Sequence, residues 1–269
     1  RSVSGRRPAT QATDGVRMHA DEASVTDDPE GVVSQVMDKN DESYQHEYNA
    51  IYKRGQQKSL WPWSDLASKV TGLRQNLPRN PYVLELGCGY GANILFLQEF
   101  SPHYYSIEFS THTVSFLQQK FPHLRNNIVV GNFAREIPFD LQFDLVVDRA
   151  ALICNSTNEI RNCISNLQSH MKTGSYFVGI DWYSTNHQEY ARGVALVDDL
   201  GEDKYTRLYS KGNSYFDPPK MHFCNREHLE DLFVEFEFVS MEEKDVNRFC
   251  INDSPAARLS SINFVCRLK

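Results

Sequence analysis

The chain has 269 residues, of which 41% are hydrophobic and 12% aromatic, enough to bury a sizeable core in one domain with appendages. Its formal net charge is −7, so no general attraction to nucleic acid or to an anionic membrane is expected. The six cysteines form neither a C-x-x-C pair nor a Cys/His cluster at zinc spacing, and no apolar run approaches the roughly 20 residues of a membrane span. These features predict a reduced, cytoplasmic protein that holds no metal.

The first 80 residues divide into two segments. Residues 1–40 are poor in large apolar side chains and are predicted to be disordered, and their basic start lacks the hydrophobic stretch of a secretory signal. Residues 41–80 are predicted to form an aromatic cap of two helices, the second ending before Pro78. The first helix carries apolar residues at helical spacing and a stop signal, namely Tyr44, Tyr48, Ile51, Tyr52 and Gly55.

From residue 81 to the end, short apolar runs alternate with longer helical segments, which is typical of a parallel sheet built from βαβ units. The predicted strands are 82–86, 104–108, 128–130, 143–148 and 176–181, followed by two late strands at 236–241 and 262–268. The predicted helices are 94–100, 114–121 and 160–171, and a further one begins at Asn225. Ser156 and Glu159 have the spacing of a capping box, and Gly174 is predicted to end that helix.

The central motif is a glycine-rich loop that directly follows the first predicted strand. Gly87, Gly89 and Gly91 stand at alternate positions before a helix, where the lack of side chains lets the backbone approach a ligand. Glu108 ends the second predicted strand, where a carboxylate in Rossmann-like folds accepts hydrogen bonds from ribose hydroxyls. The glycine loop and Glu108 together predict a nucleoside ligand.

Two nucleoside cofactors fit this loop, because Gly87, Gly89 and Ala92 also match the dinucleotide pattern G-x-G-x-x-A. Glu85 favours S-adenosylmethionine, since a carboxylate two residues before the first glycine would repel a pyrophosphate but helps to hold an amino-acid end. The chain also ends in two late strands and does not repeat the pattern of its first half, which again favours S-adenosylmethionine over a dinucleotide. A nicotinamide-dependent oxidoreductase remains the alternative.

On these motifs the chain resembles the class I S-adenosylmethionine-dependent methyltransferases of small molecules. The resemblance covers residues 42–269, and it rests on residues 85–91, Glu108, Gly131-Asn132-Phe133, the segment 143–152 and Lys172-Thr173-Gly174. It implies a Rossmann-like, seven-stranded, mostly parallel α/β sheet with helices on both faces and the last strand antiparallel. The cofactor-binding candidates that follow are Glu85, Gly87, Cys88, Gly89, Gly91, Asn93, Glu108, Asn132, Phe133 and Asp148.

The acceptor side is defined less sharply by the sequence. The candidate catalytic residues are Asp148, Asp181 and His187, all expected near the carboxyl ends of strands, although Asp148 fits equally well in an ion pair with Arg149 or a bond to a loop amide. Residues 182–224 are expected to form a substrate-facing insertion. The candidate lid and substrate residues, which core packing would also explain, are Tyr44, Tyr48, Tyr52, Trp61, Trp63, Trp182 and Tyr183.

The predicted function is the transfer of a methyl group from S-adenosylmethionine to an oxygen, nitrogen or sulfur of a small molecule by in-line displacement. Alignment of the two reactants would be the main task of the protein. The segment after the fourth strand lacks the Asn/Asp-Pro-Pro-aromatic signature for amide or nucleobase nitrogens, and together with the net acidity this argues against a nucleic-acid partner. A protein methyltransferase and a non-catalytic binding module remain alternatives.

Overall fold

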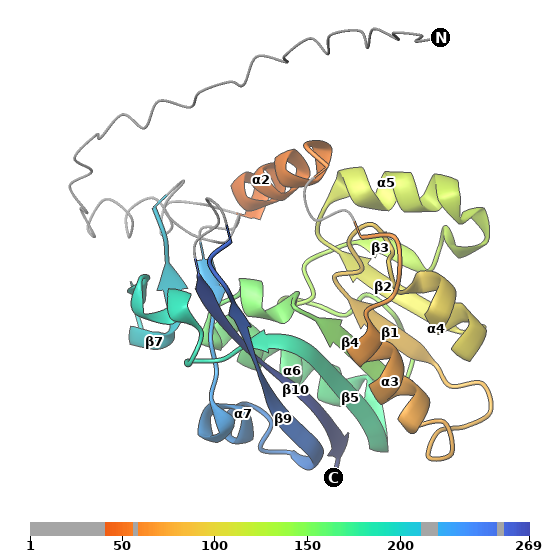
Figure 1. Cartoon of the computed structure of the whole chain (residues 1–269). Coiled ribbons are helices and arrows are strands. Elements are labelled where there is room, and N and C mark those ends of the chain that lie inside the picture. Colours follow the sequence, from red (N-terminus) through yellow and green to blue (C-terminus); the bar gives the residue numbers. More distant parts are fainter. Residues whose placement is uncertain (1–40, 56–58, 211–219, 252–255) are drawn as a thin grey trace, which may run out of the picture.

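A seven-stranded sheet with helices on both faces forms the centre of the computed structural model, which describes residues 41–55, 59–210, 220–251 and 256–269 (Figure 1). In spatial order its strands are β3 (Ile128–Val130), β2 (Tyr104–Glu108), β1 (Val83–Leu86), β4 (Phe143–Arg149), β5 (Met171–Tyr183), β10 (Ala257–Leu268) and β9 (Phe236–Arg248). The first five are parallel, and β10 runs antiparallel to both of its neighbours. This arrangement confirms the predicted fold class.

The helices divide the core into two layers, one on each side of the sheet. On one side lie α3 (Ser64–Gly72), α4 (Ile94–Phe100) and α5 (Thr111–Lys120), and on the other lie α6 (Thr157–Ser169) and α7 (Arg226–Leu232). Strand β1 is buried at all four positions, because a central parallel strand is covered by helices on both faces. The continuous apolar runs of the sequence reflect this burial.

The predicted start of α6 is confirmed and its predicted end is wrong. The side chain of Ser156 accepts from the amide of Glu159, and the Glu159 carboxylate accepts from the amide of Ser156 at 2.6 Å. The helix ends at Ser169, however, because Met171 already pairs with Phe143 in the sheet. Gly174, expected to end this helix, lies within β5 at φ +90°.

The region after β5 contains a second sheet that the sequence did not predict. Strands β6 (Val194–Asp198), β7 (Gly201–Leu208) and β8 (Lys220–His222) form it, and a 3-10 turn, η3 (Gln188–Ala191), precedes it. Two other 3-10 turns are η1 (Pro122–Leu124) and η2 (Leu152–Cys154). Strands β9 and β10 are also longer than predicted, since their outer halves are polar and pair with each other.

Helix α2 (Asp41–Lys53) lies above the carboxyl ends of the strands, beside α5 (Figure 1). Gln45 Nε2 donates to the carbonyl oxygen of Phe109 at 2.9 Å, and Asn49 Oδ1 accepts from the hydroxyl of Ser110 at 2.7 Å. These bonds attach the helix to the turn that follows β2. The predicted disorder of residues 1–40 lies outside the described residues. No helix in the described ranges is long and apolar enough to cross a bilayer.

Candidate active site

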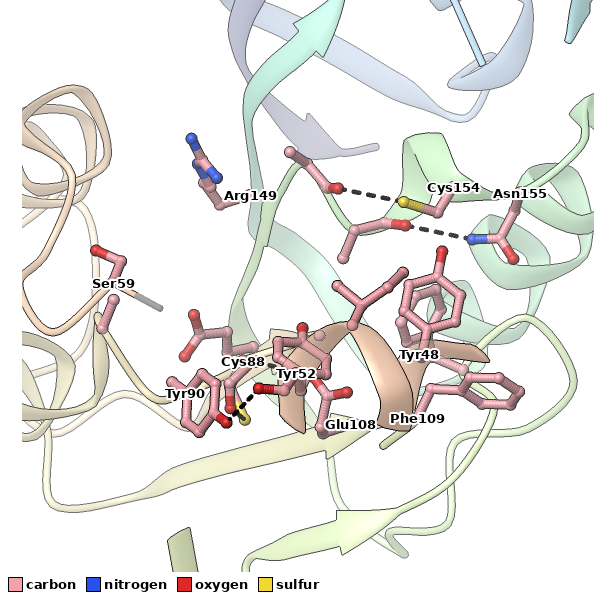
Figure 2. A pocket seen from close by; sticks show the side chains of 18 of the residues that line it. Tyr48, Tyr52, Ser59, Cys88, Tyr90, Glu108, Phe109, Arg149, Cys154 and Asn155 are labelled. Atoms are coloured by element: carbon pink, nitrogen blue, oxygen red, sulfur yellow. Dashed lines mark hydrogen bonds between the residues drawn. The ribbon is translucent and has the colours of Figure 1, made fainter. Parts of the chain in front are cut away.

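A cavity of about 730 Å³ lies between α2 and the carboxyl ends of the parallel strands (Figure 2). Its floor is formed by the glycine loop after β1, the end of β2, the segment after β3 and the turn after β4. Side chains of α2 and β8 complete the wall. Ligands of open α/β sheets bind at this edge, where the strand order reverses.

The glycine loop is held close to two neighbouring segments. A Cβ on Gly87, at φ +66°, would lie 2.4 Å from the Cβ of Ala151 in the turn after β4. A Cβ on Gly89, at φ +52°, would lie 3.1 Å from the hydroxyl of Tyr52 on α2. Both positions therefore require glycine, because of the backbone angle and because side chains already surround the loop.

Glu108 lines the cavity and is only 3% exposed. Its Oε2 accepts a hydrogen bond from the amide of Gly89 at 2.8 Å, and its Oε1 accepts one from the amide of Ser110 at 2.8 Å. Burial raises the pKa of this carboxyl group, and the bonds from backbone amides offset only part of that effect. The carboxylate is thus placed where it was expected to meet a ribose.

A buried pair beside the glycine loop supplies an acceptor for a ligand. Glu85 accepts from Asn93 Nδ2 at 2.8 Å and from the hydroxyl of Tyr104 at 2.6 Å. Burial raises the pKa of Glu85 more than these bonds lower it. Within the described ranges, Asn93 Oδ1 is buried without a hydrogen-bond partner, and Asn93 lines the cavity. A buried acceptor of this kind fits the ammonium group of an amino-acid end.

Asn132 and Phe133 follow β3 and also line the cavity. Asn132 Oδ1 accepts from the amide of Ala134 at 3.0 Å, which fixes the bend of the segment. The ring of Phe133 lies 3.7 Å from the position that a Cβ on Gly87 would take. The segment thus offers an apolar surface to a planar base next to the glycine loop.

The remaining wall carries polar side chains from α2, η2, α6 and β8. Lys220 Nζ lies 2.7 Å from Glu159 Oε2 and 5.4 Å from the ring centre of Tyr44. Burial acts to raise the pKa of Glu159, but Lys220 and Ser156 outweigh it and leave the pKa lowered. Tyr48 points toward Cys154 (Figure 2).

Burial controls the ionisation of the Tyr48 phenol and the Cys154 thiol. It raises the pKa of Tyr48 well above its ordinary value and that of Cys154 to about 11. The phenol and the thiol are therefore protonated near neutral pH and act as neutral hydrogen-bonding groups.

Asp148, predicted to face the cofactor and to be catalytic, lies beneath the cavity instead. It is fully buried and accepts from Trp182 Nε1 at 2.7 Å and from the amides of Leu152 at 2.9 Å and Ala151 at 3.2 Å. Burial raises its pKa to about 7. Of the two structural explanations for Asp148, the bond to loop amides is the one observed, and it shapes the turn that follows β4.

Four further candidates do not line the cavity. Trp182 is fully buried against Phe264, because its position on β5 faces the core. His187 accepts from the amide of Glu189 at the start of η3, and burial lowers its pKa to about 4. Asp181 forms an ion pair with Arg149 of β4, and Trp61 is 75% exposed.

The role expected for Gly91 also differs. A Cβ there would lie 2.7 Å from the side chains of Ile94 and Leu117, so this glycine makes room for packing between α4 and α5. It does not line the cavity.

The cavity joins most of the other candidates with several residues that the sequence did not single out. The predicted residues along its wall are Tyr44, Tyr48, Tyr52, Trp63, Glu85, Gly87, Cys88, Gly89, Asn93, Glu108, Asn132, Phe133 and Tyr183. The missed residues include Arg149, Cys154, Asn155, Glu159, Lys220 and Met221. Those from 149 to 155 could have been found, since they directly follow a strand at the ligand-binding edge. Lys220 has no comparable signal in the sequence.

Comparisons with known proteins agree with this geometry. Residues 83–174 match the family model of the methyltransferase domain. An S-adenosylmethionine-dependent methyltransferase from Anabaena variabilis superposes with a TM-score of 0.58 at 14% identity, covering 86% of this chain and 96% of that one. CalS10, an amino pentose methyltransferase from Micromonospora echinaspora, superposes with a TM-score of 0.51 at 17% identity, covering 82% and 96%.

TehB from Haemophilus influenzae is similar over a smaller share of its length. Its TM-score is 0.50 at 17% identity, with 75% of this chain and 62% of TehB covered, so the chain spans less than two thirds of that protein. No curated protein matches the chain by sequence. Because all of these structural similarities are at low sequence identity, they show a shared fold only.

The fold, the family match and the site lead to one assignment. The two crowded glycines and the open acceptor on Asn93 fit the amino-acid end of an adenosyl cofactor, and Glu108 and Phe133 fit its nucleoside. The chain therefore carries a class I S-adenosylmethionine-dependent methyltransferase domain, and S-adenosylmethionine is the methyl donor of this family.

Proposed function

We propose that the protein methylates an oxygen, nitrogen or sulfur atom of a small molecule held beneath α2. The observation that carries the proposal is that side chains from three separate parts of the chain line the acceptor side of the cavity. Tyr44 and Tyr48 of α2 lie over it, Cys154 and Asn155 border it after β4, and Lys220 closes it from β8. A pocket walled on several sides suits a small acceptor, whereas a peptide or a nucleic acid needs an extended groove.

The residues on this side favour hydrogen bonding to an acceptor. S-adenosylmethionine supplies a methyl group activated on a sulfonium. The ion pair between Glu159 and Lys220 offers one acceptor and one donor at fixed positions. The side-chain carbonyl oxygen of Asn155 adds an acceptor, while its Nδ2 already donates to two backbone carbonyl oxygens. Aromatic rings of Tyr48 and Tyr183 exclude water, which favours a reaction that removes positive charge. We assign these groups to alignment of the acceptor.

The structural similarity to CalS10, an amino pentose methyltransferase, supports a small acceptor as the substrate class. A role for Asp181 or His187 as a general base does not fit, since neither lines the cavity. Glu159 is the carboxylate on the acceptor side among the residues described, and its lowered pKa keeps it deprotonated and able to accept a hydrogen bond.

Methyl labelling of a cell extract tests the proposal. The purified chain is incubated with methyl-labelled S-adenosylmethionine and an extract that has been separated into small molecules and macromolecules. We expect label in the small-molecule fraction, and less of it with Lys220→Met, because the ion pair that aligns the acceptor is lost. A surface variant, Arg192→Met, is expected to label like the wild type, because Arg192 does not line the cavity. Label found only in proteins or nucleic acids would contradict the proposal.

A further inference from the structure

Arg149 is the last residue of β4 and lies directly beside the glycine loop. Leu86 pairs with Asp148 where the parallel strands β1 and β4 lie side by side, so Arg149 stands next to Gly87 at the edge of the sheet. Glu85 pairs with Val147, and side chains alternate along a strand, so Glu85 and Arg149 belong to the same face. Arg149 is therefore near the end of the cavity that holds the Glu85–Asn93 pair.

Neighbouring side chains fix the guanidinium of Arg149. Its Cζ lies 3.7 Å from the ring centre of Trp63, and its Nη2 donates to Asp181 Oδ2 at 2.9 Å. The other oxygen of Asp181 lies 3.8 Å from Lys244 Nζ and accepts from the hydroxyl of Ser261 at 3.3 Å. Stacking on one side and an ion pair on another leave a planar cation with little freedom to turn.

Backbone strain is concentrated around this cation. Ala150 has φ +54° and Asp181 has φ +56°, and within the described ranges these are the two non-glycine residues in the left-handed region. One directly follows Arg149 in the chain, and the other is its ion-pair partner. Strained positions that persist in a fold cluster at ligand-binding sites, because the surrounding structure must stabilise them.

One donor of Arg149 is left for a ligand. Arg149 lines the cavity, and its Nε–H is buried without a hydrogen-bond partner among the described residues. A guanidinium has five N–H groups in a planar fork that matches a carboxylate. Figure 2 shows Arg149 on the side of the pocket opposite Cys154 and Asn155, which border the proposed acceptor region.

An unsatisfied donor at Arg149 and an unsatisfied acceptor at Asn93 thus border the same end of the cavity. An α-amino acid carries a carboxylate and an ammonium on one carbon, which is the complementary pattern. We propose that Arg149, held by Trp63 and Asp181, binds the α-carboxylate of the methyl donor. The proposal rests on the cofactor assignment and is independent of which acceptor the enzyme uses.

Calorimetric titration with two ligands tests this role without measuring activity. The first ligand is S-adenosylhomocysteine, and the second is its decarboxylated analogue, which keeps the ammonium and the nucleoside. We expect the wild type to bind the first about 10- to 100-fold more tightly, as a charged hydrogen-bonded pair implies. In Arg149→Met this preference disappears, through a loss of affinity for S-adenosylhomocysteine alone.

Two further variants keep the test decisive. Arg192→Met removes a surface arginine that is ion-paired with Glu189 outside the cavity, and it should retain the wild-type preference. Arg149→Lys keeps the charge without the fork and should retain only part of the preference. Thermal unfolding shows whether each variant is folded.

Three results bear on the proposal in different ways. Equal affinity of the wild type for both ligands would overturn it, and this result does not depend on any variant. A preference that survives in folded Arg149→Met would overturn it as well. Failure of the wild type to bind S-adenosylhomocysteine at all would instead contradict the cofactor assignment.

Discussion

The amide of Gly89 donates a hydrogen bond of 2.8 Å to the carboxylate of Glu108, so the glycine loop and the end of β2 form one unit. A residue of the loop after β1 and the last residue of β2 thereby define the same end of the cavity. The carboxylate is nearly fully buried. It orders the loop through this hydrogen bond, and it also lines the ligand site. Changes at either residue should affect cofactor affinity more than folding.

Replacement of Gly89 by arginine should abolish binding of S-adenosylhomocysteine. The side chain would begin 3.1 Å from the hydroxyl of Tyr52 and extend into the cavity, at a φ that disfavours any side chain. Gly174→Arg is the matched control, since Gly174 also has a positive φ but has open space around it. We expect similar losses of melting temperature in both variants and a loss of affinity in the first alone. Unchanged affinity in Gly89→Arg would rule out the loop as the binding site.

Glu108→Gln should weaken S-adenosylhomocysteine binding by roughly 1.5–3 kcal/mol, the range of hydrogen bonds to charged groups. The amide keeps the shape of the side chain but is a poorer acceptor for ribose hydroxyls. Glu136→Gln, at an exposed position after β3, serves as the control. Calorimetric dissociation constants of the two variants are compared, and equal values would show that Glu108 has only a structural role.

Weaker docking of α2 should speed release of the cofactor. Asn49 accepts from the hydroxyl of Ser110 at 2.7 Å and from the amide of His112 at 3.2 Å, both at the N-terminus of α5. Loss of these two bonds in Asn49→Ala should raise the dissociation rate of S-adenosylhomocysteine about 30-fold, from about 1 kcal/mol per bond. Stopped-flow displacement measures this rate. Lys53→Ala, at an exposed position of the same helix, should leave it unchanged, and equal rates in both variants would mean that α2 does not cover the cofactor.

The pKa of Asp148 predicts a pH dependence of stability. Burial raises this pKa to about 7, compared with about 3.9 for an unfolded aspartate. The folded state therefore binds an extra proton between these values, and this contribution to stability is present below pH 4 and is lost as the pH rises toward 7. Asp148→Asn removes the titration. The difference in unfolding free energy between wild type and variant should fall as the pH rises from 4 to 7, by at most about 1.4 kcal/mol per pH unit. A difference that is constant or grows over this range would contradict the raised pKa.

The parallel part of the sheet could be predicted because its signals are local. Buried strands, helix caps and the glycine loop each leave a short pattern, and Glu108 ends a strand that such a pattern identifies. The sheet formed by β6, β7 and β8 has no such pattern. Strand β7 reads GEDKYTRL, which is mostly polar, although it pairs with the adjacent β6 across a short turn as well as with β8.

The parts of the site that the sequence did not predict depend on contacts between distant segments. The bond between Arg149 and Asp181 exists because β4 and β5 are neighbours, and the bond between Glu159 and Lys220 spans 61 residues. Trp182 was expected to line the cavity, but the alternation of β5 turns it toward the core. Which face a strand residue occupies depends on how the sheet is covered, and composition alone does not determine this.

Titration of the purified wild type with S-adenosylhomocysteine and, separately, with NADH tests the central assignment most directly. The geometry of the glycine loop, Glu85 and Glu108 predicts saturable one-to-one binding of S-adenosylhomocysteine, lost in Gly89→Arg, and no binding of NADH. Tight binding of NADH without binding of S-adenosylhomocysteine would contradict the assignment.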